Sequence, residues 1–226
     1  MEETIQNLTV MAIPLLLAIT LHEAAHGWVA WKLGDNTAKM MGRVSFNPLV
    51  HIDPFGTIIL PALLIFSGSG FLFGYAKPVP VNFRALNNPR RDMVLVALAG
   101  PGANILLLLV AALAMNFIGA IPGVANEWVG LNLSYMIFIN AILAVFNMLP
   151  LPPLDGGRVA VGILPNFISR PLSRLEPYGM LILIMLIFII PVAAGYLGFN
   201  FNLFQHLIGP PVEYIVSIAD KLTRLF

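Results

Sequence analysis

Apolar residues occur in long runs that are separated by short polar connections. Four of these runs are each long enough for a helix that crosses a bilayer, which takes about 20 residues. They cover approximately residues 5–31, 92–118, 130–149 and 178–198. The pattern therefore predicts an all-α polytopic membrane protein with four spanning helices.

Three further stretches predict other structures. Residues 55–76 are interrupted by proline and glycine, which suits a short or re-entrant membrane segment. The prolines of the next stretch, residues 77–84, favour an extended strand or a loop. In residues 203–226, apolar side chains recur at helical spacing beside charged ones, which predicts an amphipathic helix at the membrane interface.

The composition supports a membrane protein and excludes other classes. Only 10% of the residues are charged and 58% are apolar, whereas a soluble domain carries about 25% charged residues. A net charge of +1 offers no basic face for nucleic acid. Cysteine is absent, so disulfides, thiolate ligands and a cysteine nucleophile are excluded and any metal must bind nitrogen or oxygen. The opening Met1-Glu2-Glu3 lacks the basic region of a cleavable signal. We expect one membrane-embedded domain over 1–226.

Basic residues are distributed unevenly over the connections, and this predicts the topology. The N-terminus and the connection 119–129 carry only acidic residues among their charges. The other connections hold Lys32, Lys39, Arg43, Lys77, Arg84, Arg90, Arg91, Arg158, Arg170 and Arg174. The positive-inside rule places the N-terminus and residues 119–129 outside, and both ends of 55–76 inside. That segment should then enter the membrane and return, as a wall of a wet active site. A full crossing by it is the alternative.

One apolar run contains the motif Leu21-His22-Glu23-Ala24-Ala25-His26-Gly27, which reads HExxH. His22 and His26 are four residues apart, so on a helix they share a face and can bind one metal ion. Glu23 need not be a ligand and can accept a proton from a metal-bound water. A stray histidine pair on a surface helix is the alternative, but two imidazoles and a carboxylate are costly in an apolar setting.

A catalytic zinc ion takes three protein ligands and a water, so a third ligand is needed. The candidates are Asp155, Asp53, His51, Glu176, Glu127 and His206. Asp155 is favoured because a proline-rich stretch breaks the helix before it and two glycines after it allow close backbone approach. Two crossings after His26 also return the chain to the same side. The alternative is that Asp155 only caps the next helix, as Asp53 is expected to cap a turn.

Together these motifs resemble the site-2 protease family of intramembrane zinc metalloproteases. The resemblance rests on HExxH, on Gly100-Pro101-Gly102-Ala103-Asn104, and on Asn147-Met148-Leu149-Pro150-Leu151-Pro152-Pro153-Leu154-Asp155-Gly156. It covers about residues 8–165 and points to the compact prokaryotic branch without PDZ or CBS domains. It implies a three-helix core, zinc ligands His22, His26 and Asp155, the general base Glu23, and Asn147 facing the reacting carbonyl. Asn104 and Asn140 are instead expected to hydrogen-bond between helices.

The sequence therefore predicts a Zn²⁺-dependent endopeptidase that hydrolyses peptide bonds of transmembrane substrates with a metal-activated water. We expect it in the cell membrane of a prokaryote, among lipids, with its site toward the cytosol. The stretch 77–84 would pair with an extended substrate. The alternatives are a metal transporter or sensor, or a non-catalytic scaffold with the same fold. The substrate, the trigger for cleavage and the oligomeric state stay open.

Overall fold

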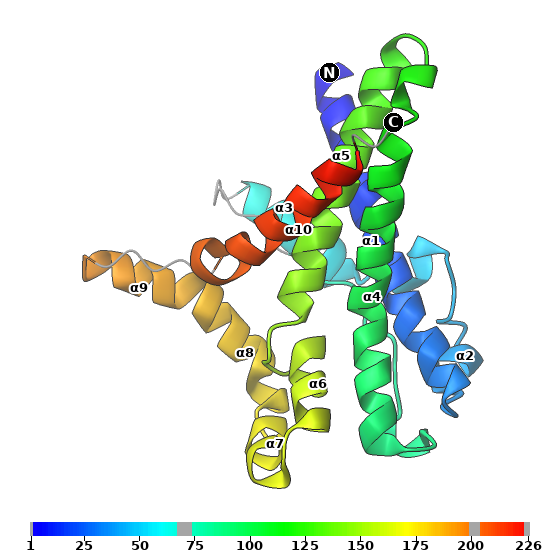
Figure 1. The fold of residues 1–226 in the computed structure, drawn as a ribbon. Coiled ribbons are helices and arrows are strands. Elements are labelled where there is room, and N and C mark those ends of the chain that lie inside the picture. The colour runs from blue at the N-terminus through cyan, green and yellow to red at the C-terminus, as the bar shows by residue number, and fades with distance from the viewer. Residues whose placement is uncertain (1, 67–73, 199–203, 224–226) are drawn as a thin grey trace.

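The computed structural model describes residues 2–66, 74–198 and 204–223, which are helical with irregular connections and contain no β-strand. Three long helices form the core: α1 (Glu2–Lys32), α4 (Pro89–Met115) and α5 (Val124–Asn147). They pack against one another in pairs (Figure 1). Small side chains line their contacts, among them the buried Ala18 and Ala141. Small residues let helix backbones approach closely, as in other membrane bundles.

Within the described residues, four helices are long and apolar enough to cross a membrane, as the hydropathy pattern predicts. They span Val10–Lys32, Pro89–Met115, Ala125–Asn147 and Asn166–Tyr196. The core helix α4 begins three residues before the predicted run, because Pro89 and the arginines after it continue the helix beyond its apolar part. Likewise α5 begins before residue 130 and ends at Asn147, shortly before Pro150. Hydropathy marks the apolar part of a helix and not its ends.

The last candidate span is built from several shorter helical pieces. It follows α6 (Asp155–Ile163) and begins with α7 (Asn166–Ser173), after which the chain passes through the turn Glu176–Tyr178. It continues as α8 (Gly179–Ile184), a wider turn at Met185–Ile189, and α9 (Ile190–Tyr196). In Figure 1 α9 points away from the three-helix core. The predicted run 178–198 thus corresponds to α8 and α9.

The interrupted segment 55–76 leaves the core and comes back to it. It starts with a wide turn, Pro54–Ile59, and the short helix α3 (Leu60–Phe66), and its residues 67–73 lie outside the described residues. The two ends are joined by a hydrogen bond from Tyr75 N to Gly56 O of 3.0 Å, and by one from Thr57 Oγ1 to Tyr75 O of 2.9 Å. Both ends therefore lie at the same level of the molecule, as a re-entrant segment requires.

The C-terminal stretch contains the helix that the apolar spacing predicts. After a wide turn at Phe204–Ile208, α10 runs over Gly209–Leu222. Its buried Val212 and Ala219 belong to one apolar cluster with side chains of α4 and α5. At its end, Asn116 Nδ2 donates to Leu222 O at 2.9 Å. The apolar side of α10 thus packs on protein, obliquely across the core helices (Figure 1).

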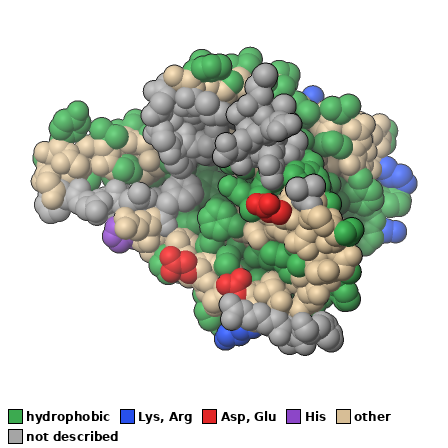
Figure 2. Space-filling view, turned by 90° about the horizontal axis from the view of Figure 1, so that it is seen from above, with side chains coloured by type: hydrophobic (Ala, Val, Ile, Leu, Met, Phe, Trp, Pro, Cys, Tyr) green, Lys and Arg blue, Asp and Glu red, His purple; other side chains and the backbone are tan. Residues whose placement is uncertain are grey.

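The two ends of the core differ in charge. The end that carries the N-terminus, seen from above in Figure 2, shows separate acidic side chains on a largely apolar surface, with Lys and Arg only at the rim. The opposite end contains the C-terminal end of α1, the N-terminal end of α4 and the helices α2 (Thr37–Met40), α6 and α7 (Figure 1). These elements contain half of the twelve basic residues.

Candidate active site

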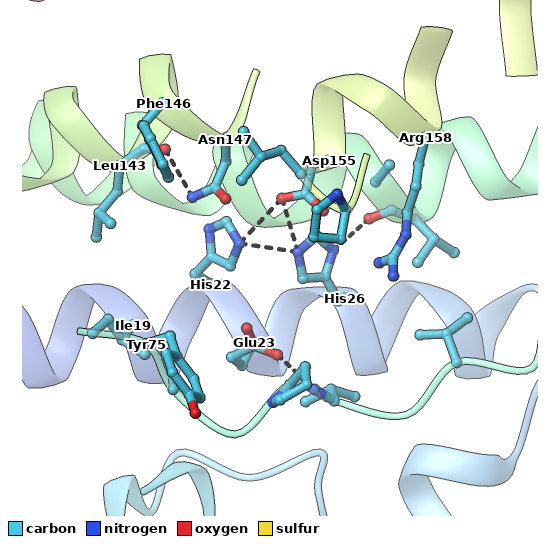
Figure 3. Close-up of a pocket in the computed structure, with 18 of the residues that line it drawn as sticks. Ile19, His22, Glu23, His26, Tyr75, Leu143, Phe146, Asn147, Asp155 and Arg158 are labelled. Carbon is cyan, nitrogen blue, oxygen red and sulfur yellow. Dashed lines mark hydrogen bonds and ion pairs between the residues drawn. The ribbon is translucent and has the colours of Figure 1, made fainter. Parts of the chain in front are cut away.

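The two histidines of HExxH lie on one face of α1 and point toward α4 and α6 (Figure 3). His22 Nδ1 lies 2.6 Å from Asn104 Oδ1, and His26 Nδ1 lies 2.7 Å from Val96 O. Both partners are carbonyl-type acceptors, so each Nδ1 carries the ring hydrogen. The two Nε2 atoms, 3.0 Å apart, then present lone pairs to each other. Metal-binding histidines are held in this way by their second nitrogen.

Asp155 completes the group from the other side. It is the first residue of α6, and Leu154 precedes it in extended conformation as the N-cap residue. Its Oδ2 lies 3.2 Å from His22 Nε2 and 3.3 Å from His26 Nε2. The carboxylate thus faces the histidines and not the end of its own helix.

The glycines after Asp155 allow this arrangement, as predicted. A Cβ on Gly156 would collide with the Met148 carbonyl, and a Cβ on Gly157 would collide with the backbone of Pro152. The connection 148–154 therefore folds back tightly onto the start of α6. This close approach brings Asp155 to the level of His22 and His26, which come from a distant part of the sequence.

Three observations indicate that the three ligand atoms fit a zinc ion. Oδ2 of Asp155 is buried and receives no hydrogen bond from the described residues, so three lone-pair donors face one another. Ligand atoms of a tetrahedral zinc ion, bonded at about 2.0–2.1 Å, lie about 3.3 Å apart, close to the separations here. Gly100 of α4 leaves the space open, because a Cβ there would collide with His26 Nε2 and the His22 ring. Within the described residues this is the group of three that could hold a metal.

Asn104 has a role at the site that the sequence reading missed. It connects helices, as expected: Asn104 Nδ2 donates to Asn140 Oδ1 at 2.8 Å, and Asn140 Nδ2 donates to Met136 O at 2.8 Å. Both side chains are fully buried. In addition, Asn104 Oδ1 orients His22. The signal was available, because Asn104 lies one helical turn after Gly100 and shares its face.

Glu23 lies beside the histidines but not among the ligand atoms (Figure 3). Its Oε2 accepts a hydrogen bond of 2.7 Å from Val79 N, in the irregular stretch after the segment 55–76. The stretch predicted as an extended strand or a loop is thus a loop that passes beside α1. It contacts Glu23 through its backbone.

A cavity of about 390 Å³ opens in front of the site. Its walls come from α1, from the loop at residues 74–83, and from the ends of α5 and α8. Asn147 lines it, and its Nδ2 donates to Leu143 O at 3.0 Å. Arg158 and Tyr75 also line it, and the sequence reading did not select them as site residues (Figure 3). The segment 55–76 therefore supplies part of the cavity wall.

The other candidate ligands lie elsewhere. Asp53 caps a helical turn through Phe55 N and Gly56 N, as expected. His51 Nε2 faces Ser45 O at 3.0 Å, and Glu176 pairs with Arg158 at 3.4 Å. Glu127 lies in the first turn of α5, and His206 lies in the turn before α10. The structure brings none of these side chains to His22 and His26.

The chain is similar to known proteins and to one family model. The family model for "Peptidase family M50" matches residues 118–190, which include Asn147 and Asp155. The chain is 39% identical to YwhC of Bacillus subtilis over 192 residues, 81% of this chain and 82% of that protein. It is 29% identical to Rip2 of Mycolicibacterium smegmatis over 213 residues, 93% of this chain and 78% of that protein.

A third relative, Rip2 of Mycobacterium tuberculosis, is 32% identical over 183 residues, 80% of this chain and 67% of that protein. All three carry the name "Putative zinc metalloprotease". No solved structure matches the chain. The family match and the extent of the similarity to YwhC show that the chain belongs to peptidase family M50, the site-2 protease family of zinc metalloproteases.

Proposed function

We propose that this metalloprotease is an intramembrane endopeptidase, which hydrolyses peptide bonds of transmembrane substrates. The observation that carries the proposal is the meeting of His22, His26 and Asp155 at a cavity between membrane-spanning helices, with Glu23 beside them. Charged and polar groups at such a depth are costly unless they are used. Metal-assisted hydrolysis of a peptide needs this combination of a metal site, a proton acceptor and room for the substrate.

The chain's own residues divide the work as follows. His22, His26 and Asp155 hold zinc, which when bound lowers the pKa of a water molecule and polarises the peptide carbonyl. Glu23 accepts the proton of the attacking water and returns it to the amine nitrogen as the C–N bond breaks. Asn147 has a second amide hydrogen besides the one given to Leu143, and this hydrogen can stabilise the developing oxyanion.

The substrate must reach the site unwound, because the carbonyls of a helix are engaged in its own hydrogen bonds. The loop at residues 74–82 runs along the cavity without regular structure, which supports pairing with an extended substrate segment. The N–H of Val79 already binds Glu23. Pairing with a substrate would therefore use Val81 rather than Val79.

The proposed location is the cell membrane of a prokaryote, with the site toward the cytosol. The charge difference between the two ends of the core supports this orientation. His22, His26 and Asp155 lie nearer the basic end, where α1 closes and α6 begins. The rival function is a metal transporter or sensor, but a transporter should have ionisable groups along a path. In the described residues, His22, Glu23, His26 and Asp155 instead lie together at one cavity.

The experiment is cleavage of model transmembrane peptides by the purified protein and by Glu23→Gln, with bound zinc counted in both. We expect about one zinc per chain in each, and cleavage by the wild type alone, because glutamine cannot accept the proton. Glu127→Gln is the matched control, since Glu127 lies at the far end of α5, and it should cleave normally. Zinc binding without cleavage of any peptide by the wild type would contradict the proposal.

A further inference from the structure

The orientation of Glu23 is not provided by the metal, since its carboxylate is not one of the ligand atoms. His22, His26 and Asp155 are each oriented by their partners and by one another. Glu23 instead depends on the loop: within the described part of the chain, Val79 N is the donor that holds it, at 2.7 Å. The position of the Pro78–Val79 peptide group therefore decides where the Glu23 carboxylate lies.

This peptide group is in turn held by Arg43, whose side chain is only 7% exposed. Its Nη2 donates to Lys77 O at 2.7 Å and to Pro78 O at 3.3 Å, and its Nη1 donates to Val50 O. The carbonyl of Pro78 and the N–H of Val79 belong to the same peptide. The guanidinium thus binds one end of the peptide whose other end binds Glu23. A cation at the carbonyl also strengthens the N–H as a donor.

The backbone of Arg43 is itself placed by the end of α2. Gly42 has a φ of +67°, a conformation that glycine adopts readily. Gly42 N donates to Lys39 O at 3.0 Å, and Arg43 N donates to Ala38 O at 2.9 Å. These two bonds form the Schellman motif that ends many helices. The helix end therefore directs the Arg43 side chain under the loop.

Packing holds the loop against α1 at the same point. A Cβ on Gly27 would lie 3.1 Å from a methyl group of Val79 and 3.1 Å from a methyl group of Val44. Gly27 follows Glu23 by one helical turn, and Val44 follows Arg43 directly. Gly27 therefore lies close to Glu23, and Val44 lies next to Arg43. The packing contact with Val79 is thus beside both residues that the peptide group connects. The link between them is built into a close-packed region.

We propose that Arg43 is a positioning residue for Glu23, acting through the Pro78–Val79 peptide. This inference rests on the proposed role of Glu23 as the proton acceptor. Arg43 does not contact the ligand atoms, so its replacement should leave zinc binding intact. It should slow the chemical step, because a misplacement of about 1 Å of a reacting group can cost about 100-fold in rate.

The first arm of the test is kinetic and uses Arg43→Gln and Arg43→Lys. We expect kcat to fall about 10- to 100-fold in Arg43→Gln, with KM within about twofold of wild type and about one zinc per chain. Arg43→Lys keeps the charge and one donor group, so it should recover part of kcat. Arg84→Gln is the matched control: Arg84 is an exposed arginine in the short helical turn Phe83–Ala85 that follows this loop, and its loss should change nothing.

The second arm needs no substrate and measures hydrogen exchange of the Val79 amide. Proline at positions 78 and 80 leaves few exchanging amides in this stretch, which simplifies the assignment. Exchange should accelerate at least about tenfold in Arg43→Gln and in Glu23→Ala, and stay unchanged in Arg84→Gln. The Arg43 variants also show by their exchange elsewhere whether the fold is intact.

Three results would overturn the proposal. Unchanged Val79 exchange in Arg43→Gln would mean that the arginine does not hold the peptide. A rise in KM with unchanged kcat would mean that Arg43 acts on substrate binding instead. A loss of zinc from Arg43→Lys would mean that Arg43 supports the metal ligands and not Glu23. If the wild type cleaves no peptide, the protease proposal fails. The hydrogen-exchange measurement then still shows whether Arg43 and Glu23 are connected through the Pro78–Val79 peptide.

Discussion

At the scale of single residues, the candidate site depends on the missing side chain of Gly100 as much as on the ligands. Gly100 is the residue of α4 that faces the two imidazoles, and it has no side chain to fill the space between them. The next turn of the same face supplies Asn104, which orients His22. One face of α4 therefore provides both the room for the ion and the support for one of its ligands.

Gly100→Ala should lose zinc. The added methyl group would collide with His26 Nε2 and the His22 ring, and the ligand set cannot close around the ion. We expect the affinity for zinc to fall at least about 100-fold, measured by competition with a chelator of known affinity. Gly102→Ala is the matched control, because a Cβ there meets no atom within 4 Å. Equal affinities in the two variants would refute this account of the site.

At the scale of elements, the short polar segments position the chemistry. Helix α2 has only four residues, yet its end places Arg43 under the loop at residues 74–82. Asp35 accepts hydrogen bonds from Asn82 N at 2.7 Å and from Thr37 N at 2.9 Å, so it ties the end of this loop to the start of α2. The loop that borders the cavity is therefore held by buried side chains at two places, by Arg43 near its middle and by Asp35 at its end.

Val81→Pro should weaken substrate binding if the loop pairs with an extended substrate. Proline removes the Val81 N–H, and the loss of backbone hydrogen bonds should raise KM about tenfold without loss of zinc. Val81→Ala keeps the N–H and is the control. Val79 is unsuitable for this test, because its N–H also holds Glu23. Equal KM values for Val81→Pro, Val81→Ala and wild type would exclude pairing at this position.

At the scale of the whole molecule, the arrangement of the spans brings distant residues together. After α1, the chain crosses the core twice, through α4 and α5, so Asp155 returns to the level of His22 and His26. Asp155 returns to this level only if residues 55–76 return to the side from which they left. The hydrogen bond between Tyr75 N and Gly56 O indicates that they do. The segment thus contributes to the cavity without changing the direction of the next helix.

Labelling of single cysteines should reveal this topology, since the chain has no cysteine of its own. We expect a membrane-impermeant maleimide to label Ala125→Cys on intact cells, and Met40→Cys and Lys77→Cys only after the membrane is opened. All three positions are exposed. Labelling of Lys77→Cys on intact cells, with Met40→Cys protected, would mean that residues 55–76 cross the membrane.

Much of the fold could be predicted from local sequence patterns, because a segment that crosses a bilayer must be apolar and helical. Apolar runs predict the spanning helices, since backbone groups in lipid must be paired within a helix. His22 and His26 were identifiable because helical spacing alone brings them together. Helix ends were less predictable: α4 and α5 extend beyond their apolar parts, where hydropathy no longer distinguishes helix from loop.

The sequence by itself determined the fold class, the two histidines of the metal group and the distribution of charge between the two ends. These follow from spacing and composition along one segment at a time. The sequence also favoured Asp155 as the third ligand, but only the tertiary structure decided that its carboxylate lies beside the histidines, that Asn104 supports His22, and that Arg43 reaches Glu23 through a peptide of another loop. Such contacts join segments far apart in the chain, and their distances depend on how helices and loops pack, which no local pattern encodes.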